Sequence, residues 1–518
     1  MRASASDQSP QNRRFSLPRI SRRSLLTSGA AAGALAASGL ALMAGTPKTG
    51  GTLRGVLTGG TAQDSWDARD HDSLFMMAAA HGAVFDCLTE IAADGALKGE
   101  LAESWSASED ARLWTFDLRK DVTFHNGKPF VAEDVLESFA LHFDPAHPSP
   151  AQPLLRDVTG IHALGDHQVQ FTLAASNADF PYLLADYHLV IYPAGYVELA
   201  MLNGIGTGLY RVQSFEPGQR LQATRVTSHY KDGRAGFFEA LDFVNVDAPS
   251  ERLNLLLEGQ ADAVAQIAPV YATQIAQAEG ITLQQLRGNQ HFSFALDGRH
   301  SLAEADAVQR ALKHAVDRQA FVDDLLLGYG AAGSDTPVGP SNPFYAGKLG
   351  ALAHDPEQAR HLLRAAGVDQ LSLRLIGGSG GQGQATAAVF AKQLKQVGVD
   401  IAVSAQPSQL SLSTSAGRAT EDWAMATYLA PGATWNRGGW ENPLFDTLLG
   451  AARSEMDSTK RRALYGELQQ LVAQSGNLII PAFADHLQAT SKAIASPPAT
   501  GAHYAMDNAR FAERWWRA

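Results

Sequence analysis

The stretch Ala83–Phe139, AVFDCLTEIAADGALKGELAESWSASEDARLWTFDLRKDVTFHNGKPFVAEDVLESF, has the pattern of a small α+β unit. It opens with the end of an amphipathic helix over 83–88. Alternating side chains predict a strand over Leu113–Leu118, and 122–124 reads as a further short strand. A helix with acidic side chains in its first turn begins at Ala132, where the helix dipole favours negative charge. We expect the core of this unit to be aromatic, built from Trp105, Trp114, Phe116 and Phe124.

Four short phrases in this stretch resemble the signature of the family 5 extracellular solute-binding proteins. They are Leu-Ala-x-Ser-Trp at Leu101–Trp105, Phe-x-Leu-Arg at Phe116–Arg119, Phe-x-x-Gly at Phe124–Gly127 and the pair Asp134-Val135. Members of this family are the peptide-, dipeptide- and nickel-binding receptors of bacterial ABC importers. Because the four phrases occur in the same order as in the family, together they are a far stronger signal than any single motif.

The resemblance extends over roughly residues 51–490. Gly206–Tyr210 is similar to the family's Gly-Thr-Gly-Pro-Tyr phrase, with Leu209 where proline is usual. Arg310–Arg318 resembles its Arg-x-Ala helix, part of an amphipathic helix that we predict over 309–328. Asp355–Gly367 contains the complete Asp-Pro-x-x-Ala-x-x-Leu-Leu-x-x-Ala-Gly phrase.

A chain of 518 residues is too long for one hydrophobic core, so several domains are expected. The resemblance implies an α/β fold of the two-lobe periplasmic binding protein type, with a hinge between the lobes and an extra α+β subdomain in the first lobe. We expect the lobes to be joined by two strands, near 265–269 and 479–483. The predicted parts are a signal peptide (1–46), the first lobe in three pieces (47–90, 191–267 and 480–518), the extra subdomain (91–190) and the second lobe (268–479).

The first 46 residues have the composition of a targeting segment. A basic region with Arg13, Arg14, Arg19, Arg22 and Arg23 precedes an uncharged Leu/Ala/Gly run over Ser24–Gly45, and Ser21–Leu26 matches the twin-arginine export pattern. The alternative is an uncleaved membrane anchor, because about 20 apolar residues span a bilayer. We expect export by the twin-arginine machinery, cleavage of the signal and a periplasmic protein.

The charge of the remaining chain excludes nucleic acid as a partner. Without residues 1–46, the chain has 36 basic and 52 acidic side chains, a net charge of −16. Nucleic-acid binding requires basic patches. Cys87 is the only cysteine, so no intramolecular disulfide forms, and its apolar surroundings indicate a buried small side chain. We expect a monomer.

A glycine-rich loop supplies the alternative of an exported enzyme. Residues 378–383 fit the dinucleotide fingerprint Gly-x-Gly-x-x-Gly, and 377–381 fit the hydrolase elbow Gly-x-Ser-x-Gly. One short loop that fits two unrelated motifs is more simply a flexible connection. His142 and His147 near Asp144 lie on a proline-rich segment, which favours solvated histidines over a metal site. We therefore expect no catalytic residue, cofactor or metal.

Ligand contacts are predicted mainly from Glu421–Trp440, which we read as a loop-forming segment rich in aromatic residues. Aromatic rings stack on ligands, and an arginine offers a planar fork for a carboxylate. The predicted contacts are Tyr428, Trp435, Arg437 and Trp440, with Trp66 from an earlier loop.

The family resemblance implies a receptor that captures peptides or peptide-like amines between its lobes and delivers them to an ABC permease and ATPase. Peptide receptors of the family carry an aspartate in this region that pairs with the peptide ammonium. Here residues 427–432 read TYLAPG and contain no carboxylate. An unpaired buried ammonium is costly, so the substrate departs from an ordinary peptide.

Overall fold

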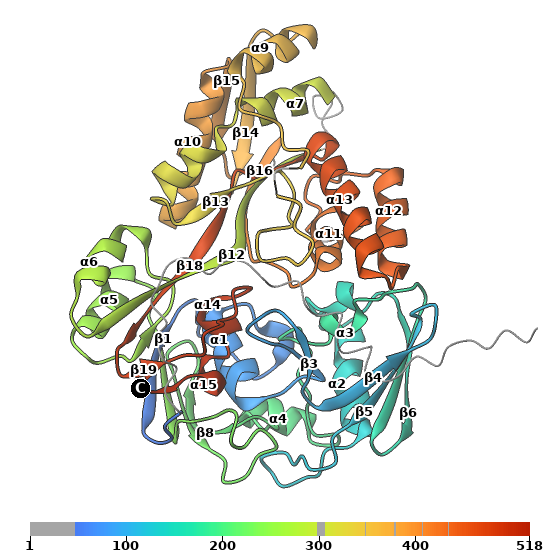
Figure 1. Cartoon of the computed structure of the whole chain (residues 1–518), viewed down its shortest axis with the longest axis vertical. Coiled ribbons are helices and arrows are strands. Elements are labelled where there is room, and N and C mark those ends of the chain that lie inside the picture. Colours follow the sequence, from blue (N-terminus) through green and yellow to red (C-terminus); the bar gives the residue numbers. More distant parts are fainter. Residues whose placement is uncertain (1–46, 298–305, 348, 378–379, 407, 434) are drawn as a thin grey trace, which may run out of the picture. The chain divides into compact units, whose positions relative to one another are not determined.

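The computed structural model describes residues 47–518 except 298–305, 348, 378–379, 407 and 434. The predicted signal peptide and two residues of the glycine-rich loop lie outside these residues. A mixed sheet of twelve strands runs through the described chain (Figure 1). Its strands in spatial order are β15 (Val399–Val403), β14 (Leu371–Ile376), β16 (Leu410–Ser415), β12 (Ile281–Leu296), β18 (Ala482–Ser491), β11 (Ala263–Val264), β1 (Thr52–Leu57), β10 (Ala240–Asn245), β9 (Arg220–Arg225) and β8 (Tyr210–Glu216), with β13 (Gly330–Ala332) beside β18 and β17 (Leu478–Ile479) beside β12.

The long strands β12 and β18 are shared by two groups of elements, which we call the first and second lobes (Figure 1). Ile281–Leu286 pairs with His486–Ser491 in the first lobe, and the pairing resumes at Gln290 after a register shift. Beyond that shift, β12 pairs with β16 and β17 of the second lobe. The strand that enters the second lobe is therefore β12, whereas the sequence suggested a crossing at 265–269.

The first lobe contains a second, four-stranded sheet built from the stretch that resembles the family. Its order is β4 (Ala102–Ala107), β5 (Leu113–Leu118), β7 (Gln168–Leu173) and β6 (Val158–Gly165), and helix α2 (Ala132–Ala140) packs beside it. Trp114, Phe116 and Phe124 are buried in its core, and Trp105 is partly buried. The predicted strand over 122–124 is reduced to one bridge between Thr123 and Pro129.

The helix predicted over 83–88 ends earlier than expected. Helix α1 (Leu74–Ala79) continues into the π-helical turn η3 (Ala80–Val84), and Phe85 is already extended. Gly82 packs against the C-terminal segment so closely that a Cβ atom there would lie 2.0 Å from the carbonyl oxygen of Ala509. The close backbone contact explains why the helix has a glycine here.

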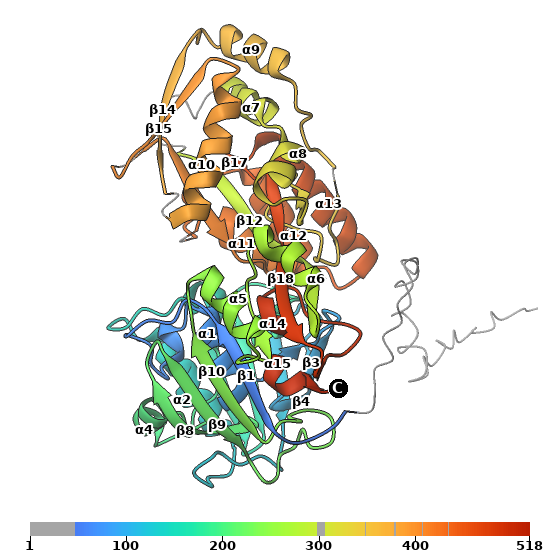
Figure 2. The ribbon, with the colours of Figure 1, turned by 90° about the vertical axis from the view of Figure 1, so that its left-hand side faces the viewer.

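The end of the chain returns to the first lobe. Figure 2 shows α14 (Ala505–Asn508) and α15 (Phe511–Arg514) beside β1. Phe511 stacks on Phe243 of β10 at 5.0 Å, and Trp515 is fully buried. The remaining first-lobe elements are β2 (Thr89–Ile91), β3 (Leu97–Gly99), α3 (Phe180–Leu183), α4 (Val197–Asn203), α5 (Pro249–Leu257), α6 (Ala272–Gln277), β19 (Ile494–Ala495), β20 (Trp516–Arg517) and the 3-10 turns Ala68–Asp70, Leu141–Phe143, Gln152–Leu154 and Pro269–Tyr271.

The second lobe carries eight helical segments among the described residues: α7 (Asp306–Ala315), α8 (Arg318–Ala320), η7 (Phe321–Leu325), α9 (Pro356–Ala365), α10 (Gly380–Lys395), α11 (Glu421–Leu429), α12 (Pro443–Ser454) and α13 (Ser458–Ser475). The helix predicted over 309–328 is interrupted, because Asp317 is extended and caps α8 through the Ala320 N–H. Helix α11 (Glu421–Leu429) occupies a segment that was expected to be a loop, and Thr420 caps it. Within the described residues, no helix combines the length and apolar character needed to cross a bilayer.

Candidate ligand-binding site

A cavity lies where the two lobes meet. The second lobe contributes Ala419 and Trp423 to its walls, and the first lobe contributes His81, Ile91, Ala185, Asp186, Tyr187, His503, Tyr504, Asn508 and Arg510. Its volume is about 30 Å³, which holds about two water molecules. Trp423 also belongs to the aromatic core of the first lobe's small sheet, so the lobes are in direct apolar contact at this wall.

Arg418 directly precedes Ala419, one of the two second-lobe residues that line the cavity. Its guanidinium is 5.9 Å from the ring centre of Trp423 and 5.6 Å from that of Tyr428. It donates to the carbonyl oxygens of Ala416 and Gly417 at 3.1 Å. No carboxylate among the described residues forms an ion pair with it. Such a guanidinium is free to bind an anion.

The electrostatic surroundings keep Arg418 charged. Burial disfavours the cation, but the hydroxyls of Tyr428, Tyr504 and Tyr187 and the carboxylate of Asp186 outweigh it and raise the pKa. Two of these tyrosines belong to the first lobe, and their rings meet edge to face at 5.8 Å. Burial raises the pKa of both hydroxyls, which remain protonated donors.

Asp186 is the one carboxylate among the residues that line the cavity, and one of its oxygens interacts with His188. The backbone N–H of His188 donates to its Oδ1 at 3.0 Å, and the His188 ring nitrogen Nδ1 lies 2.6 Å from the same oxygen. Burial opposes ionisation, but the His188 interactions lower the pKa of Asp186. His188 therefore occupies Oδ1, whereas Oδ2 accepts no hydrogen bond from the described residues.

A buried ion cluster supports the first-lobe wall. The ammonium of Lys231 donates to Asp86, Glu100 and Glu513 at 2.8, 2.6 and 2.9 Å. Arg510 reaches the same cluster through Glu100 at 2.6 Å. Burial disfavours the charge of Asp86, yet Lys231 lowers its pKa, whereas burial raises the pKa of Glu100 to about 8. The cluster fixes Arg510 where its side chain lines the cavity.

The histidines of the cavity are neutral. Burial lowers the pKa of His81 far below its usual range and that of His503 to about 4. Nε2 of His81 lies 3.3 Å from the Arg510 guanidinium, which has only donors, so this nitrogen accepts. The proton of neutral His81 is therefore on Nδ1.

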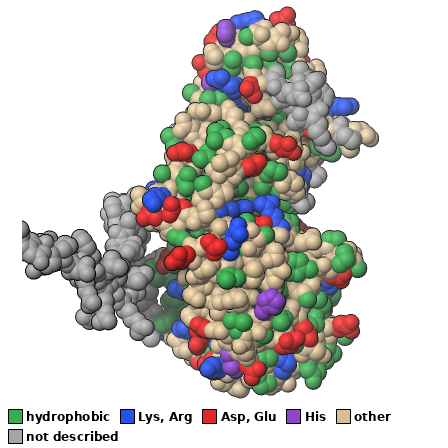
Figure 3. Space-filling model, turned by 90° about the vertical axis from the view of Figure 1, so that its right-hand side faces the viewer, with side chains coloured by type: hydrophobic (Ala, Val, Ile, Leu, Met, Phe, Trp, Pro, Cys, Tyr) green, Lys and Arg blue, Asp and Glu red, His purple; other side chains and the backbone are tan. Residues whose placement is uncertain are grey.

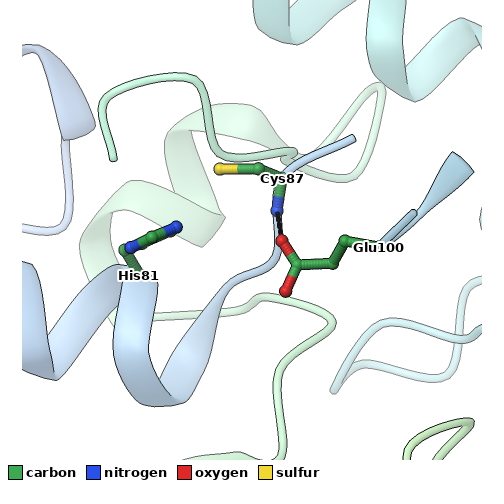
Figure 4. Close-up of side chains that lie close together, drawn as sticks. All are labelled: His81, Cys87 and Glu100. Atoms are coloured by element: carbon green, nitrogen blue, oxygen red, sulfur yellow. Dashed lines mark hydrogen bonds between the residues drawn. The ribbon is translucent and has the colours of Figure 1, made fainter. Parts of the chain in front are cut away.

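His81, Cys87 and Glu100 lie close enough together to suggest a metal site (Figure 4). Their candidate ligand atoms are within 4.8 Å of one another. However, the Glu100 carboxylate already accepts from the Cys87 N–H at 2.8 Å and from Lys231 and Arg510. Burial raises the pKa of the Cys87 thiol, which opposes the thiolate that binds metals. The same Lys231 ammonium lies among Asp86, Glu100 and Glu513, the second buried acidic group. These sets have the chemistry of an ion-paired cluster.

A third group, Asp67, Asp70 and His147, lies nearer the surface. Arg69 binds Asp67 at 2.7 Å, and His147 lies 2.9 Å from Asp70. His147, which we predicted to be a solvated loop histidine, therefore interacts with a carboxylate. His142 is buried, and its Nδ1 lies 2.6 Å from the Ser149 hydroxyl oxygen.

The structure distributes the five predicted contact residues over three environments. Tyr428 is buried on α11, where its hydroxyl donates to the Ala416 carbonyl at 3.0 Å beside Arg418. Trp435 and Arg437 stack on each other at 5.0 Å on an exposed segment. Trp440 is packed in a second-lobe core, with its indole N–H donating to Ser475. Trp66 is 2% exposed and packs on Phe85 and Phe215.

Sequence reasoning missed Arg418, Tyr187, Tyr504 and Asn508. Arg418 precedes the segment that attracted attention by three residues, and a single arginine carries no local signal. Tyr187 and Tyr504 are over 300 residues apart in the chain. Only the packing of the C-terminal segment onto the first lobe brings them together.

The lobes also touch through polar contacts away from the cavity. Arg461 of α13 binds Asp179 of the first lobe at 2.5 Å, and the Ala178 N–H donates to the Arg453 carbonyl at 2.8 Å. Arg453 in turn binds Asp422 at 2.5 Å. Figure 3 shows basic side chains gathered across the middle of this face of the molecule.

Comparison with known proteins places the chain in a family. The pattern of the bacterial extracellular solute-binding proteins, family 5 (middle region), matches residues 96–447. The nickel-binding periplasmic protein of Escherichia coli (strain K12) is 26% identical over 75% of this chain and 81% of its own length. Di/tripeptide-binding protein 1 of Pseudomonas aeruginosa is 29% identical over 56% of this chain, and the match spans 59% of that protein.

Solved structures share the fold. The periplasmic binding protein AgaA of A. tumefaciens R10, in complex with agropinic acid, has a TM-score of 0.79 at 20% identity, covering 90% of this chain and 99% of that one. DppA of Helicobacter pylori, in complex with the peptide STSA, has a TM-score of 0.78 at 19% identity with the same coverage. These confirm the predicted two-lobe α/β fold. The chain belongs to the bacterial extracellular solute-binding proteins of family 5.

Proposed function

We propose that this protein is the periplasmic substrate-binding receptor of an ABC importer, which captures a small solute between its lobes and delivers it to the permease and ATPase. Family membership and the binding functions named for its relatives support this role. The observation that carries it is the cavity whose walls come from both lobes.

Movement of the lobes about β12 and β18 would admit and enclose the solute. Both strands cross between the lobes, and the register shift between Leu286 and Gln290 interrupts their ladder there. Hinges of this kind absorb rotation at a few residues. A cavity of about 30 Å³ is smaller than any peptide, so binding requires the walls to separate first.

The proposed contacts are Tyr428, Arg418 and Trp423 from the second lobe and Tyr187 and Tyr504 from the first. Trp435 and Arg437 remain predicted ligand contacts, for a solute that extends past the cavity. Trp66 and Trp440 remain predictions too, although their rings pack against core residues. The lobe boundaries inferred from the sequence are likewise proposals.

We further propose that the protein is exported by the twin-arginine route, works as a monomer and makes or breaks no bond. The relatives are binding proteins, and they give no support to the hydrolase or dinucleotide alternative. Twin-arginine export is supported by Ser21–Leu26 in the sequence.

Native mass spectrometry of protein purified from its own periplasm tests the receptor function. A solute bound at one per chain, together with small-angle scattering that becomes more compact when the solute is added back, is the expected result. A nucleotide, or a covalent adduct on Ser379 that is lost in Ser379→Ala, would instead establish the enzyme. Disruption of the gene for the permease that this receptor serves should abolish uptake of the identified solute.

A further inference from the structure

The first turn of α11 lies between the two lobes. Trp423 is 4% exposed and packs in the aromatic core of the first lobe's small sheet, although α11 belongs to the second lobe. Asp422 binds Arg453 at 2.5 Å, and the Arg453 carbonyl accepts from the N–H of Ala178 in the first lobe at 2.8 Å. We call this arrangement, with the lobes in contact at α11, the closed arrangement. Separation of the lobes would return water to the turn.

Glu421 begins this turn and is buried without a basic partner. The residue is 2% exposed, and its Oε1 accepts from the Phe344 N–H at 2.5 Å. Among the described residues, no lysine, arginine or histidine lies within ion-pair distance of its carboxylate. Burial disfavours the charged form of a carboxyl group that has no cation beside it. The closed arrangement therefore favours a protonated Glu421.

The charged groups that face Glu421 come from both lobes. Asp179 of the first lobe repels the carboxylate, and Arg461 of α13 attracts it but is bound to Asp179 at 2.5 Å. The Arg461 guanidinium lies 5.7 Å from the ring centre of Phe344, whose N–H binds Glu421. The other titratable groups around this turn are Tyr182 of the first lobe and Asp422, Arg453, Arg462 and Tyr465 of the second.

The helix dipole does not distinguish the two arrangements of the lobes. Glu421 is in the first turn of α11, where the dipole favours negative charge. The helix keeps this position relative to Glu421 whether the lobes are together or apart. Only the burial of the carboxyl and the approach of Asp179 depend on closure.

Protonation of Glu421 and closure of the lobes are therefore linked. Burial raises the pKa of Glu421 to about 7 from its usual value near 4.5, and Asp179 adds to the shift. Both causes weaken when the lobes separate, because water returns to the carboxyl and Asp179 moves away with the first lobe. A group whose pKa is higher in the closed arrangement takes up a proton on closing. Closing is thus favoured as pH falls through about 7.

We propose that Glu421 is a pH-sensitive switch for lobe closure, protonated when the lobes are together and ionised when they are apart. Glu421 is not among the residues that line the cavity, so the switch acts on closure without a contact to the solute. This inference rests on the proposed receptor function and adds regulation of its closing movement by pH.

Hydrogen exchange at the Ala178 amide of solute-free protein tests the proposal. That N–H is bound to the Arg453 carbonyl across the lobes, so its protection measures the ratio of closed to open protein. With a pKa of about 7 when closed and near 4.5 when open, this ratio should be about tenfold higher at pH 6 than at pH 8.5. The comparison uses rates corrected for the intrinsic pH dependence of exchange. The radius of gyration from small-angle scattering should fall over the same range.

Three variants complete the experiment. Glu421→Gln keeps an acceptor for the Phe344 N–H but carries no charge, so its protection should be high and the same at both pH values. Glu421→Ala removes the carboxyl altogether and should also lose the pH dependence, which covers a failure of Glu421→Gln to fold. Glu357→Gln makes the same chemical change at a side chain that is 89% exposed on α9. This matched control should respond to pH as wild type does.

Equal protection of wild type at the two pH values, or a pH dependence that persists in Glu421→Gln, would overturn the proposal. The switch and the receptor function can fail separately. A pH-independent ratio in protein that still becomes more compact when its periplasmic solute is added back would remove the switch and keep the receptor.

Discussion

Arg461 and Asp179 form an ion pair between the lobes at 2.5 Å, and their side chains are 13% and 4% exposed. Arg461 is on α13 of the second lobe, and Asp179 directly precedes α3 of the first. Burial alone raises the pKa of Asp179, and the Arg461 guanidinium opposes this. The two charges are thus removed from water only where the lobes meet.

Loss of this pair should favour the open arrangement. In Asp179→Asn, Arg461 keeps a buried charge without its partner, a situation that costs about 3–5 kcal/mol unless water returns. Opening of the lobes readmits water, so we expect the solute to bind about tenfold to a hundredfold more weakly and scattering to report a larger radius of gyration. The double variant Asp179→Asn with Arg461→Gln should recover part of the affinity. Unchanged affinity in Asp179→Asn would show that the Arg461–Asp179 pair does not stabilise the closed arrangement of the lobes.

The stability of the protein should depend on the ionisation of Glu421. Burial raises the pKa of this carboxyl to about 7 from its usual value near 4.5, with Asp179 adding repulsion. The protonated form is favoured by folding, so its stabilisation is complete below the unfolded pKa and is lost as pH rises through about 7. In Glu421→Gln the amide oxygen still accepts from the Phe344 N–H, which lies 2.5 Å from Oε1.

Above pH 7, Glu421→Gln should therefore be more stable than wild type by up to about 3 kcal/mol, while the two proteins should converge near pH 4.5. Urea unfolding followed between pH 4.5 and 8.5 measures this difference. A difference that does not vary with pH would show that Glu421 has an ordinary pKa.

Lys231→Met should destabilise the first lobe strongly. Its ammonium is the shared partner of Asp86, Glu100 and Glu513, all of which are almost completely buried. Removing one partner from a buried ion cluster costs about 3–5 kcal/mol. We expect a large fall in melting temperature, whereas Arg220→Gln at the exposed Asp242 pair should change stability by less than about 1 kcal/mol. Comparable effects of the two substitutions would contradict the structural role of the cluster.

Gly82→Ala should displace the π-helical turn from the C-terminal segment. The added Cβ would lie 2.0 Å from the backbone oxygen of Ala509, and backbone cannot yield as a flexible side chain can. We expect a loss of more than about 2 kcal/mol in unfolding free energy and weaker solute binding. Gly95→Ala is the control that separates backbone strain from steric clash. Gly95 has φ +80°, which strains an alanine, but no heavy atom lies within 4 Å of its Cβ position. Gly82→Ala should alter solute affinity more than Gly95→Ala, because Gly82 follows the cavity-lining His81 directly.

Local patterns were sufficient for much of the fold. The alternation over Leu113–Leu118 gives β5, and the acidic first turn that begins at Ala132 gives α2. The predictions failed where a tertiary contact competes with the pattern. The helix expected to reach residue 88 ends at Val84, after a turn in which Gly82 packs against the Ala509 backbone. The predicted loop beyond Thr420 is helical, with Trp423 buried in the core of the other lobe.

The sequence by itself determined the family, the two-lobe α/β fold and the absence of a carboxylate at 427–432, because each is written in consecutive residues. Only the tertiary structure decided which side chains share the cavity. Trp423, Tyr187 and Tyr504 come from segments far apart in the chain, and the distance between them depends on long-range strand pairing and on the meeting of the lobes. The charge balance of a site depends on those distances, and local sequence patterns do not contain them.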